Sequence, residues 1–374
     1  MRKATALLSF AAAALLAASP APAADWPMFL KDGAHSSYAQ SSPKAPYALK
    51  WRFATKGAVF SSPVISKGKL FVGSYDKNLY ALDAATGKLL WSFSTGGEIL
   101  STPAADSDSV YFGSKDGNVY ALDAATGKLR WSYKTDGSVL TSPLVQNGTV
   151  FIGSNDLYMY ALGSADGKKI WRSKLLDTPF YGAIYSSPAA YEGAVLAAGK
   201  NGIIYSLDMK SGGRNWSKKT QSAIYASPSV RDGVLYVPSY DRKILALNAA
   251  TGKNVWIRSL KEAFAYSSPV VDKDVVYLAL GDGHIMIYDR AKGMVRGDFK
   301  LPAGIYSTPV LTSSGNLIVG CEDGGVYALD VRTGAVLWRY STGGSVHSSP
   351  AVLDDAVYIG SEDGSVYAFG PQDK

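Results

Sequence analysis

One unit of sequence recurs eight times along this chain, at a spacing of 40 to 45 residues, and this repeat limits the possible folds strongly. Each unit contains a Ser/Thr-Pro pair, with prolines at Pro63, Pro103, Pro143, Pro188, Pro228, Pro269, Pro309 and Pro350. A tryptophan recurs with the same period, and Gly297 occupies the one slot that lacks it: Trp51, Trp91, Trp131, Trp171, Trp216, Trp256 and Trp338. A period of about 40 residues with several short β-runs per unit is typical of a β-propeller.

The first complete unit predicts four antiparallel strands. Residues 61–65, 70–74, 78–83 and 89–93 are short runs, rich in β-branched and aromatic residues and bounded by Gly, Asp or Asn. Asp-Gly pairs and the Ala-Ala-Thr-Gly-Lys segment at 84–88 lie between such runs in several units. They suit tight turns, because glycine tolerates a positive φ.

The two ends of the repeat array are incomplete in complementary ways. The eighth unit stops at Phe369 without a tryptophan strand, and the first tryptophan strand, Leu49–Thr55, has no unit before it. Joining these leftovers completes the last unit and removes exposed sheet edges. We therefore predict an all-β, eight-bladed β-propeller of four-stranded antiparallel blades, closed by the N-terminal strand as the outermost member of the last blade.

The N-terminus has the pattern of an export signal. Two basic residues precede an apolar stretch over 4–18, and Ala21-Pro22-Ala23 suits cleavage after Ala23. We expect a signal peptide at 1–23, a leader at 24–48, the propeller at 49–370 and a tail at 371–374. The apolar stretch is shorter than the roughly 20 residues of a membrane span, and the only cysteine, Cys321, is far from the cleavage point. We expect a periplasmic or secreted monomer without a membrane span or lipid anchor.

Residues 81–91 read Ala-Leu-Asp-Ala-Ala-Thr-Gly-Lys-Leu-Leu-Trp. This segment resembles the tryptophan-docking motif Ala-x-Asp-x-x-Thr-Gly-x-x-x-Trp of the PQQ-like, or quinoprotein-type, β-propeller repeats. Residues 121–131 and 328–338 match it at every fixed position, and 246–256 miss only at Asn248. The leader, with Trp-Pro-Met-Phe at 26–29, is also similar to that of secreted members, so the resemblance covers almost the whole mature chain.

The resemblance implies one of two functional classes. PQQ-dependent dehydrogenases of this family hold the quinone with calcium, beside a disulfide between adjacent cysteines and within long insertions. Non-enzymatic scaffolds such as BamB, from the outer-membrane assembly machinery, have eight blades and a similar length. This chain has one cysteine and no long insertion, so the resemblance favours a BamB-like scaffold without the lipoprotein cysteine. PQQ with calcium is expected only under the alternative, a small quinoprotein oxidoreductase.

The residues themselves predict no catalytic, cofactor-binding or metal site. The three histidines, His35, His284 and His347, lie in separate units without the spacing of a metal pair. No Gly-x-Ser-x-Gly motif occurs. The formal charge is +7, but the basic residues are scattered, so we expect no nucleic-acid partner. The recurring tryptophans are expected to be structural, because each can bury roughly 150–250 Å² between neighbouring blades.

The residue three positions before each repeat proline varies from unit to unit. The eight residues are Phe60, Leu100, Leu140, Tyr185, Tyr225, Tyr266, Tyr306 and His347. At the start of the innermost strands they would surround the mouth of the central channel. Two interpretations stay open: large side chains that fill the axis, or a recognition surface built from amphipathic tyrosines.

The loops beside this position are the least repetitive in the chain, and binding residues concentrate on loops held by a rigid scaffold. The longest, at 177–181, adds Phe180 and Tyr181 to the candidate binding face of Phe60, Tyr185, Tyr225, Tyr266, Tyr306 and His347. We therefore expect an exported, non-enzymatic propeller that binds or assembles an envelope or secreted protein partner. A carbohydrate-binding propeller is a second alternative, supported only by the tyrosines.

Overall fold

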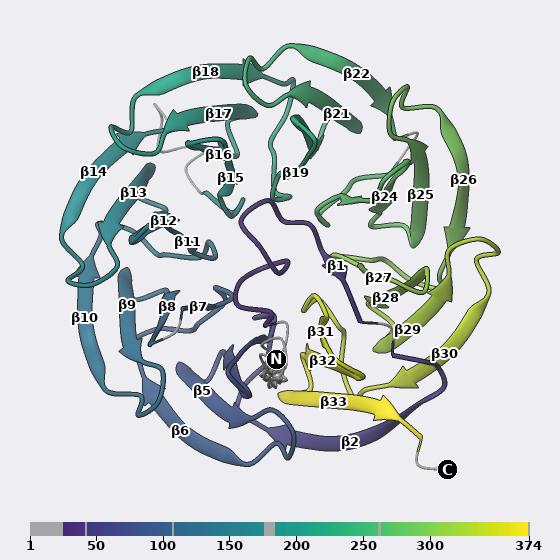
Figure 1. Cartoon of the computed structure of the whole chain (residues 1–374), viewed down its shortest axis with the longest axis horizontal. Coiled ribbons are helices and arrows are strands. Elements are labelled where there is room, and N and C mark those ends of the chain that lie inside the picture. The colour runs from purple at the N-terminus through teal and green to yellow at the C-terminus, as the bar shows by residue number, and fades with distance from the viewer. Residues whose placement is uncertain (1–24, 42, 107, 176–183, 261–262, 373–374) are drawn as a thin grey trace, which may run out of the picture.

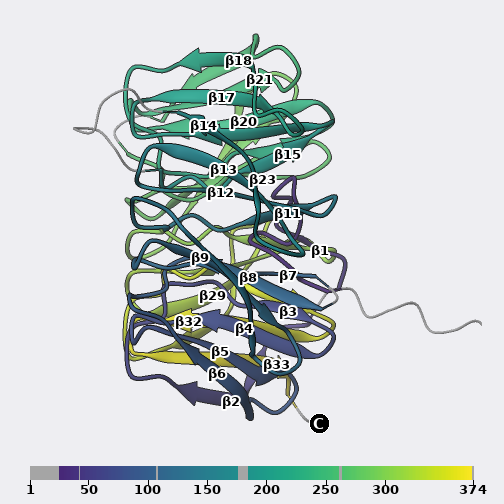
Figure 2. The same cartoon turned by 90° about the vertical axis from the view of Figure 1, so that its left-hand side faces the viewer.

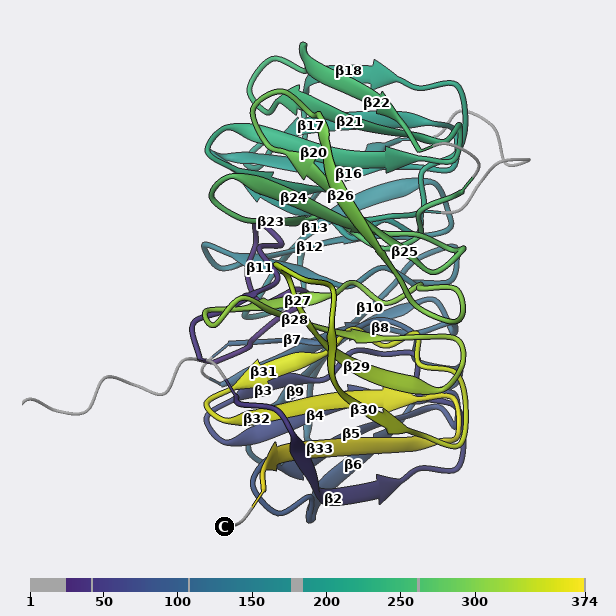
Figure 3. The same ribbon diagram turned by 90° about the vertical axis from the view of Figure 1, so that its right-hand side faces the viewer.

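The structure is a computed structural model, and it describes residues 25–41, 43–106, 108–175, 184–260 and 263–372. These residues form eight sheets arranged as blades around a central axis (Figure 1), so the predicted all-β, eight-bladed propeller is confirmed. Seen from the side, the blades stack into one thick disc (Figures 2 and 3). None of the described segments is a helix long and apolar enough to cross a membrane.

Each blade is a four-stranded antiparallel meander that runs from the axis to the rim. Blade 1 comprises β3 (Val64–Ser66), β4 (Lys69–Gly73), β5 (Asn78–Asp83) and β6 (Leu89–Ser94), and blade 2 comprises β7 (Ala104–Ala105), β8 (Ser109–Gly113), β9 (Asn118–Asp123) and β10 (Leu129–Lys134). Blade 3 comprises β11 (Leu144–Gln146), β12 (Thr149–Gly153), β13 (Tyr158–Gly163) and β14 (Lys169–Lys174), and blade 4 comprises β15 (Ala189–Tyr191), β16 (Ala194–Ala198), β17 (Ile203–Asp208) and β18 (Arg214–Lys219).

The second half of the ring repeats this arrangement. Blade 5 comprises β19 (Ser229–Arg231), β20 (Val234–Ser239), β21 (Lys243–Asn248) and β22 (Asn254–Ser259), and blade 6 comprises β23 (Val270–Val271), β24 (Val275–Ala279), β25 (His284–Asp289) and β26 (Val295–Lys300). Blade 7 comprises β27 (Val310–Thr312), β28 (Asn316–Gly320), β29 (Gly325–Asp330) and β30 (Val336–Ser341), with β1 (Tyr38–Ala39) added beside β27. Blade 8 comprises β31 (Ala351–Leu353), β32 (Ala356–Ser361), β33 (Ser365–Pro371) and β2 (Tyr47–Ala54).

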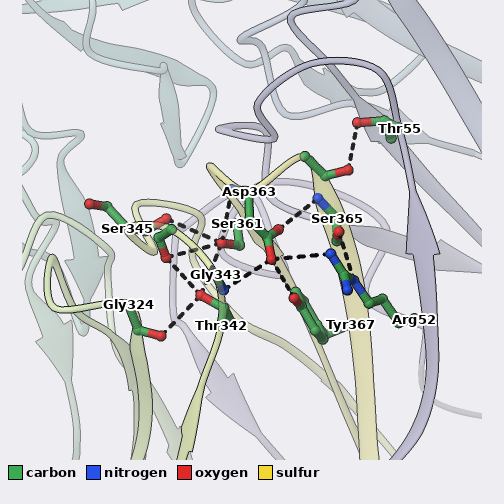
Figure 4. Close-up of polar contacts among 12 residues, drawn as sticks. Arg52, Thr55, Gly324, Thr342, Gly343, Ser345, Ser361, Asp363, Ser365 and Tyr367 are labelled. Atoms are coloured by element: carbon green, nitrogen blue, oxygen red, sulfur yellow. Dashed lines mark hydrogen bonds and ion pairs between the residues drawn. The ribbon is translucent and has the colours of Figure 1, made fainter.

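The ring closes in blade 8, where the N-terminal strand β2 pairs antiparallel with the C-terminal strand β33. The register runs from Tyr47 opposite Pro371 to Ala54 opposite Ser365, so the predicted closure is confirmed. Side chains reinforce the ladder (Figure 4): Arg52 Nε donates to Ser365 Oγ at 2.9 Å, and its guanidinium lies 3.5 Å from the Asp363 carboxylate. The two ends of the chain therefore share one sheet, and β2 covers the side of β33 that would otherwise be a free edge.

A second closure lies at the axis, in the hydroxyl circle formed by the Ser or Thr that precedes each repeat proline. The backbone N–H of each such residue donates to the hydroxyl of its counterpart in the next blade, at 2.9–3.2 Å. The members are Ser62, Thr102, Ser142, Ser187, Ser227, Ser268, Thr308 and Ser349, and the last bonds back to the first. Proline cannot supply an N–H, so the residue before it provides the donor that links the blades.

The tryptophans lie between blades at the rim. Each indole Nε1 donates to a carbonyl of the following blade: Trp51 to Ala84, Trp91 to Ala124, Trp131 to Ser164, Trp171 to Met209, Trp216 to Ala249, Trp256 to Arg290 and Trp338 to Tyr47. The Trp131 ring also lies against Gly167, where a Cβ atom would come within 2.6 Å of the indole. Gly167 has φ +68° as well, so both the turn and the ring contact require glycine.

Blade 6 uses a different side chain at its interface with blade 7. A Cβ atom at Gly297 would meet nothing within 4 Å, so the tryptophan slot is empty. Phe299, two residues further along β26, lies instead against Gly334, which is the counterpart of Gly167. The interface is therefore filled by an aromatic ring from a neighbouring position on the same strand.

The leader segment covers one end of the central channel. Asp25 accepts a hydrogen bond from the backbone of Lys67, and Trp26 bridges to Ile65, which places the leader on the face of the β3–β4 turns. Its carbonyls then accept N–H groups from the inner strands of several blades: Pro27 from Ala105, Gly33 from Ala190, Ala34 from Val230 and Ser37 from Leu311. In Figure 1 this segment crosses the centre of the ring. We call the face of the ring that carries the β3–β4 turns and the leader the turn face, and the opposite face the loop face.

Candidate functional site

The eight residues that stand three positions before the repeat prolines surround the channel, as the sequence suggested. They were predicted at the start of the innermost strands, but they lie in loops. Phe60 lies four residues before β3, in the loop rather than at the start of the inner strand. The reason is the Ser-Ser-Pro segment, whose polar groups are used in the hydroxyl circle and the bond from Gly73 N–H to Ser61 Oγ instead of a sheet ladder. We call these eight residues the first ring.

The first ring lines an axial cavity of about 170 Å³, together with the hydroxyl circle. Phe29 of the leader lines the same cavity and meets the buried His35 ring edge-on at 5.4 Å. Burial lowers the pKa of His35, whose Nδ1 bonds the Pro228 carbonyl at 2.7 Å. The leader thus bounds the cavity on the side of the turn face, and the first ring lies on the side of the loop face.

Six members of the first ring form one unbroken aromatic arc. The ring centroids are separated by 5.9 Å for Tyr185–Tyr225, 5.5 Å for Tyr225–Tyr266, 4.8 Å for Tyr266–Tyr306, 4.9 Å for Tyr306–His347 and 5.6 Å for His347–Phe60. Leu100 and Leu140 occupy the two remaining blades. Tyr185 is 41% exposed. These spacings are those of interacting aromatic pairs, so the arc is a continuous surface rather than separate rings.

A second ring lies beside the first, and our sequence analysis did not identify it. It consists of the residue that begins each turn between the second and third strands of a blade: Tyr75, Lys115, Asn155, Lys200, Tyr240, Gly281, Glu322 and Glu362. In seven blades its backbone N–H donates to the residue two positions before the first-ring member, as Tyr75 does to Ala58. Tyr75 and Phe60 approach to 4.6 Å, and Tyr225 and Tyr240 to 5.4 Å. A sequence signal for the second ring was available: the position varies from blade to blade and stands just before the nearly constant Asp of each turn.

Blades 2 and 4 make one side of this mouth basic. Lys115 Nζ lies 5.0 Å from the centre of the Tyr75 ring and 3.9 Å from the Glu98 carboxylate. Lys200 Nζ lies 5.5 Å from the Tyr185 ring and 5.7 Å from the Tyr225 ring. Both lysines therefore make cation–π contacts with the arc.

Blades 7 and 8 make another part of the mouth acidic. His347 lies between two glutamates, with Nδ1 2.9 Å from Glu362 and Nε2 3.8 Å from Glu322. Burial and the charge of Glu322 raise the pKa of Tyr306, and burial with Glu98 and Glu362 raises that of Tyr75. The tyrosine hydroxyls thus stay protonated at neutral pH and can donate hydrogen bonds.

The described side chains form no candidate metal-binding group. No cluster of three or more His, Cys, Asp or Glu side chains that could hold a metal ion occurs among them. The repeated aspartates of the turns have local partners: Asp116, for example, accepts from Tyr120 at 2.8 Å and from Gly96 N–H at 2.8 Å. Asp363 accepts from Gly343 N–H in the same manner (Figure 4). This chemistry supports binding through apolar, hydrogen-bonding and charge contacts.

The predicted site residues therefore divide into three sets. Phe60, Tyr185, Tyr225, Tyr266, Tyr306 and His347 come together at the channel mouth. The tryptophans lie at the rim, between blades. Phe180 and Tyr181 lie outside the described residues, as do the predicted signal peptide and residues 373–374 of the predicted tail.

Comparisons with known proteins give both a family and several structural relatives. A family model described as outer membrane protein assembly factor BamB matches residues 94–221, 155–304 and 282–373. BamB from Moraxella catarrhalis is similar in structure, with a TM-score of 0.76 and 20% identity over 87% of this chain and 100% of that one. No curated protein matches the chain.

Two dehydrogenases are equally similar in fold. A europium-containing methanol dehydrogenase has a TM-score of 0.79 and 14% identity, covering 93% of this chain and 98% of that one. The quinohemoprotein alcohol dehydrogenase from Comamonas testosteroni has a TM-score of 0.79 and 16% identity, covering 94% and 81%. Identities this low show the fold alone, and one fold serves unrelated functions.

Proposed function

This chain belongs to the PQQ-like β-propeller family whose model is described as outer membrane protein assembly factor BamB, and we propose that it is an exported, non-enzymatic scaffold for a protein partner in the cell envelope. The observation that carries the proposal is the mouth on the loop face. There the blades keep one backbone pattern but differ in side chain, with an aromatic arc flanked by basic and acidic sides. Tyrosine rings offer large contact area at low entropic cost, which suits protein recognition.

The side chains at the mouth do not fit a quinone cofactor. The axial cavity of about 170 Å³ is smaller than the roughly 300–1,000 Å³ of typical small-molecule sites. PQQ carries carboxylates, which Glu322 and Glu362 would repel. Cys321 is the only cysteine of the chain and is buried, so no disulfide of adjacent cysteines can form. The fold is therefore compatible with the dehydrogenase alternative, but these residues do not support it.

Calorimetry separates the two alternatives. Titrating the mature protein with PQQ, with and without calcium, is expected to give no saturable heat up to high-micromolar quinone. A known PQQ-binding dehydrogenase serves as the positive control. Saturable one-to-one binding would contradict the scaffold proposal and would justify a screen for dye-linked oxidation of alcohols and aldehydes.

Photo-crosslinking tests whether the mouth binds a partner. A benzoylphenylalanine placed at Leu140, within the first ring, is expected to give one discrete higher-mass adduct in the native host. The same label at the exposed Val336 on the rim should not give it. Changing Tyr185 and Tyr225 to Ala should reduce the Leu140 adduct at least tenfold, because a truncated hot-spot aromatic typically costs about 2 kcal/mol or more of binding free energy.

The matched control is Tyr191→Ala, which removes a tyrosine at the end of β15, away from the mouth. This variant should keep the full adduct yield. If the adduct yield fell equally in the control and in the mouth variant, or fell in neither, the partner surface would lie elsewhere.

A further inference from the structure

We propose that the partner presents an arginine side chain to the acidic side of the mouth, where Glu322 and Glu362 receive its guanidinium beside the rings of Phe60 and Tyr306. This inference rests on the proposed function and specifies the chemistry that the partner must bring. Four features of the described residues support it: fixed carboxylates, an unsatisfied nitrogen, aromatic neighbours and the charge distribution around the mouth.

The two carboxylates are held at fixed positions by their backbones. Glu322 N–H donates to the Gly304 carbonyl at 3.0 Å, and Glu362 N–H donates to the Ser345 carbonyl at 2.9 Å. Ser345 also donates through its hydroxyl to the Glu322 carbonyl at 3.0 Å, so one residue ties both glutamates together. Their side chains remain 39% and 30% exposed, which leaves them within reach of a partner.

Neither glutamate has a lysine or arginine within 4 Å among the ion pairs of the described residues. Carboxylates elsewhere on the ring do have one, such as Asp123 with Arg130 at 2.8 Å and Asp323 with Arg339 at 3.1 Å. Among the described residues of the mouth, the side chain that pairs with both glutamates is His347. The acidic side therefore carries negative charge that a partner's cation can neutralise.

His347 leaves one nitrogen unsatisfied. Its Nδ1 lies 2.9 Å from Glu362, and its buried Nε2 has no hydrogen-bond partner within the described structure. Nε2 and the Glu322 carboxylate are 3.8 Å apart, too far for a direct hydrogen bond. Rotation of the exposed Glu322 side chain would open a place for a donor between them. Guanidinium offers several N–H groups in one plane, which can serve both acceptors at once.

The aromatic surroundings also suit a guanidinium. The His347 ring lies between Tyr306 at 4.9 Å and Phe60 at 5.6 Å, and arginine stacks on aromatic faces more readily than lysine. Blade 6 has Gly281 in the second ring, so that ring places no side chain beside the Tyr306 hydroxyl, from which a Cβ atom would be 3.9 Å away.

The lysines of the mouth strengthen this selection. Lys200 lies in blade 4, across the ring from Glu362 of blade 8, whereas Lys115 lies in blade 2, where it already pairs with Glu98. A cationic side chain is repelled from the side of Lys200 and attracted to the side of the glutamates, which orients the incoming segment. The charge pattern thus specifies both the sign of the ligand group and its place.

The test compares two peptides that differ only in charge. Calorimetric or fluorescence titration of the mature protein with acetyl-Gly-Ser-Arg-Ser-Gly-amide is expected to show at least tenfold tighter binding than with the citrulline peptide, its neutral isostere. The double variant Glu322→Gln, Glu362→Gln should abolish this preference. The matched control is Glu98→Gln, which removes a mouth carboxylate that already pairs with Lys115 and should keep the preference. Unchanged melting temperatures show that each variant is folded.

Three results would overturn the inference: equal binding of the arginine and citrulline peptides, a preference that survives the double glutamine variant, or a lysine peptide that binds as tightly as the arginine peptide. If any of these occurs while the Leu140 photo-adduct still forms, the scaffold proposal stands and only the arginine assignment fails. If the adduct is absent as well, both fail.

Discussion

Replacing residues 49–55 by a glycine-serine linker of equal length is expected to yield a protein that aggregates or does not fold. This segment contains most of β2, the outermost strand of the closing blade. It supplies Trp51, whose indole bonds Ala84 of blade 1, and Phe53, whose ring meets Tyr80 at 5.4 Å. Both rings are partly buried against the core, and loss of a fully buried aromatic costs about 3–5 kcal/mol. Their loss together with the β2–β33 pairing therefore rivals the roughly 5–15 kcal/mol that stabilises a typical domain.

Size-exclusion chromatography and thermal unfolding measure this outcome. Leu49→Ser is the control, because its side chain is 42% exposed and its backbone pairing with Phe369 is kept. That variant should stay monomeric and melt within a degree or two of the parent. A linker variant that remained soluble with the parent melting temperature would show that β2 does not hold the ring closed.

Trp131→Ala is expected to cost about 3–5 kcal/mol of unfolding free energy. The indole is only 8% exposed, and its Nε1 donates to the Ser164 carbonyl at 2.8 Å. Its ring also fills the space above Gly167, so truncation leaves a cavity between two blades and removes one of the two hydrogen bonds to the Ser164 carbonyl, the other coming from the Tyr111 hydroxyl at 3.3 Å. The melting temperature should fall by about 4–7 °C, measured by calorimetry or circular dichroism.

The same experiment can distinguish interface aromatics from other residues on the outer strands. Phe299→Ala should also be strongly destabilising, because Phe299 contacts Gly334 where the other blades use a tryptophan. Lys218→Ala changes the equivalent position of β18, where Trp216 already fills the interface, and should have an effect within about 0.5 kcal/mol. If Phe299→Ala behaved like Lys218→Ala, the blade 6–7 contact would depend on other side chains.

Part of the candidate site was predictable from sequence. The first ring stands at a constant distance from the repeat prolines, so its eight members could be aligned and placed around the axis. The members of the second ring could be aligned in the same way, because each precedes the nearly constant Asp of a turn. The closeness of the second ring to the first depends on how two loops fold against each other. That contact is made by bonds such as Tyr75 N–H to Ala58, across 17 residues of chain.

The repeat by itself determined the number of blades, their antiparallel strands and the closing strand. The reason is that the same local rules, of alternating side chains, glycine turns and a Ser/Thr-Pro link, recur in every unit and agree with one another. Non-repeating features were decided by the tertiary structure. Phe299 replaces a tryptophan because it is the ring that reaches Gly334. Likewise, the leader has no period, and its path follows from buried contacts such as His35 with Pro228 and backbone bonds to separate blades.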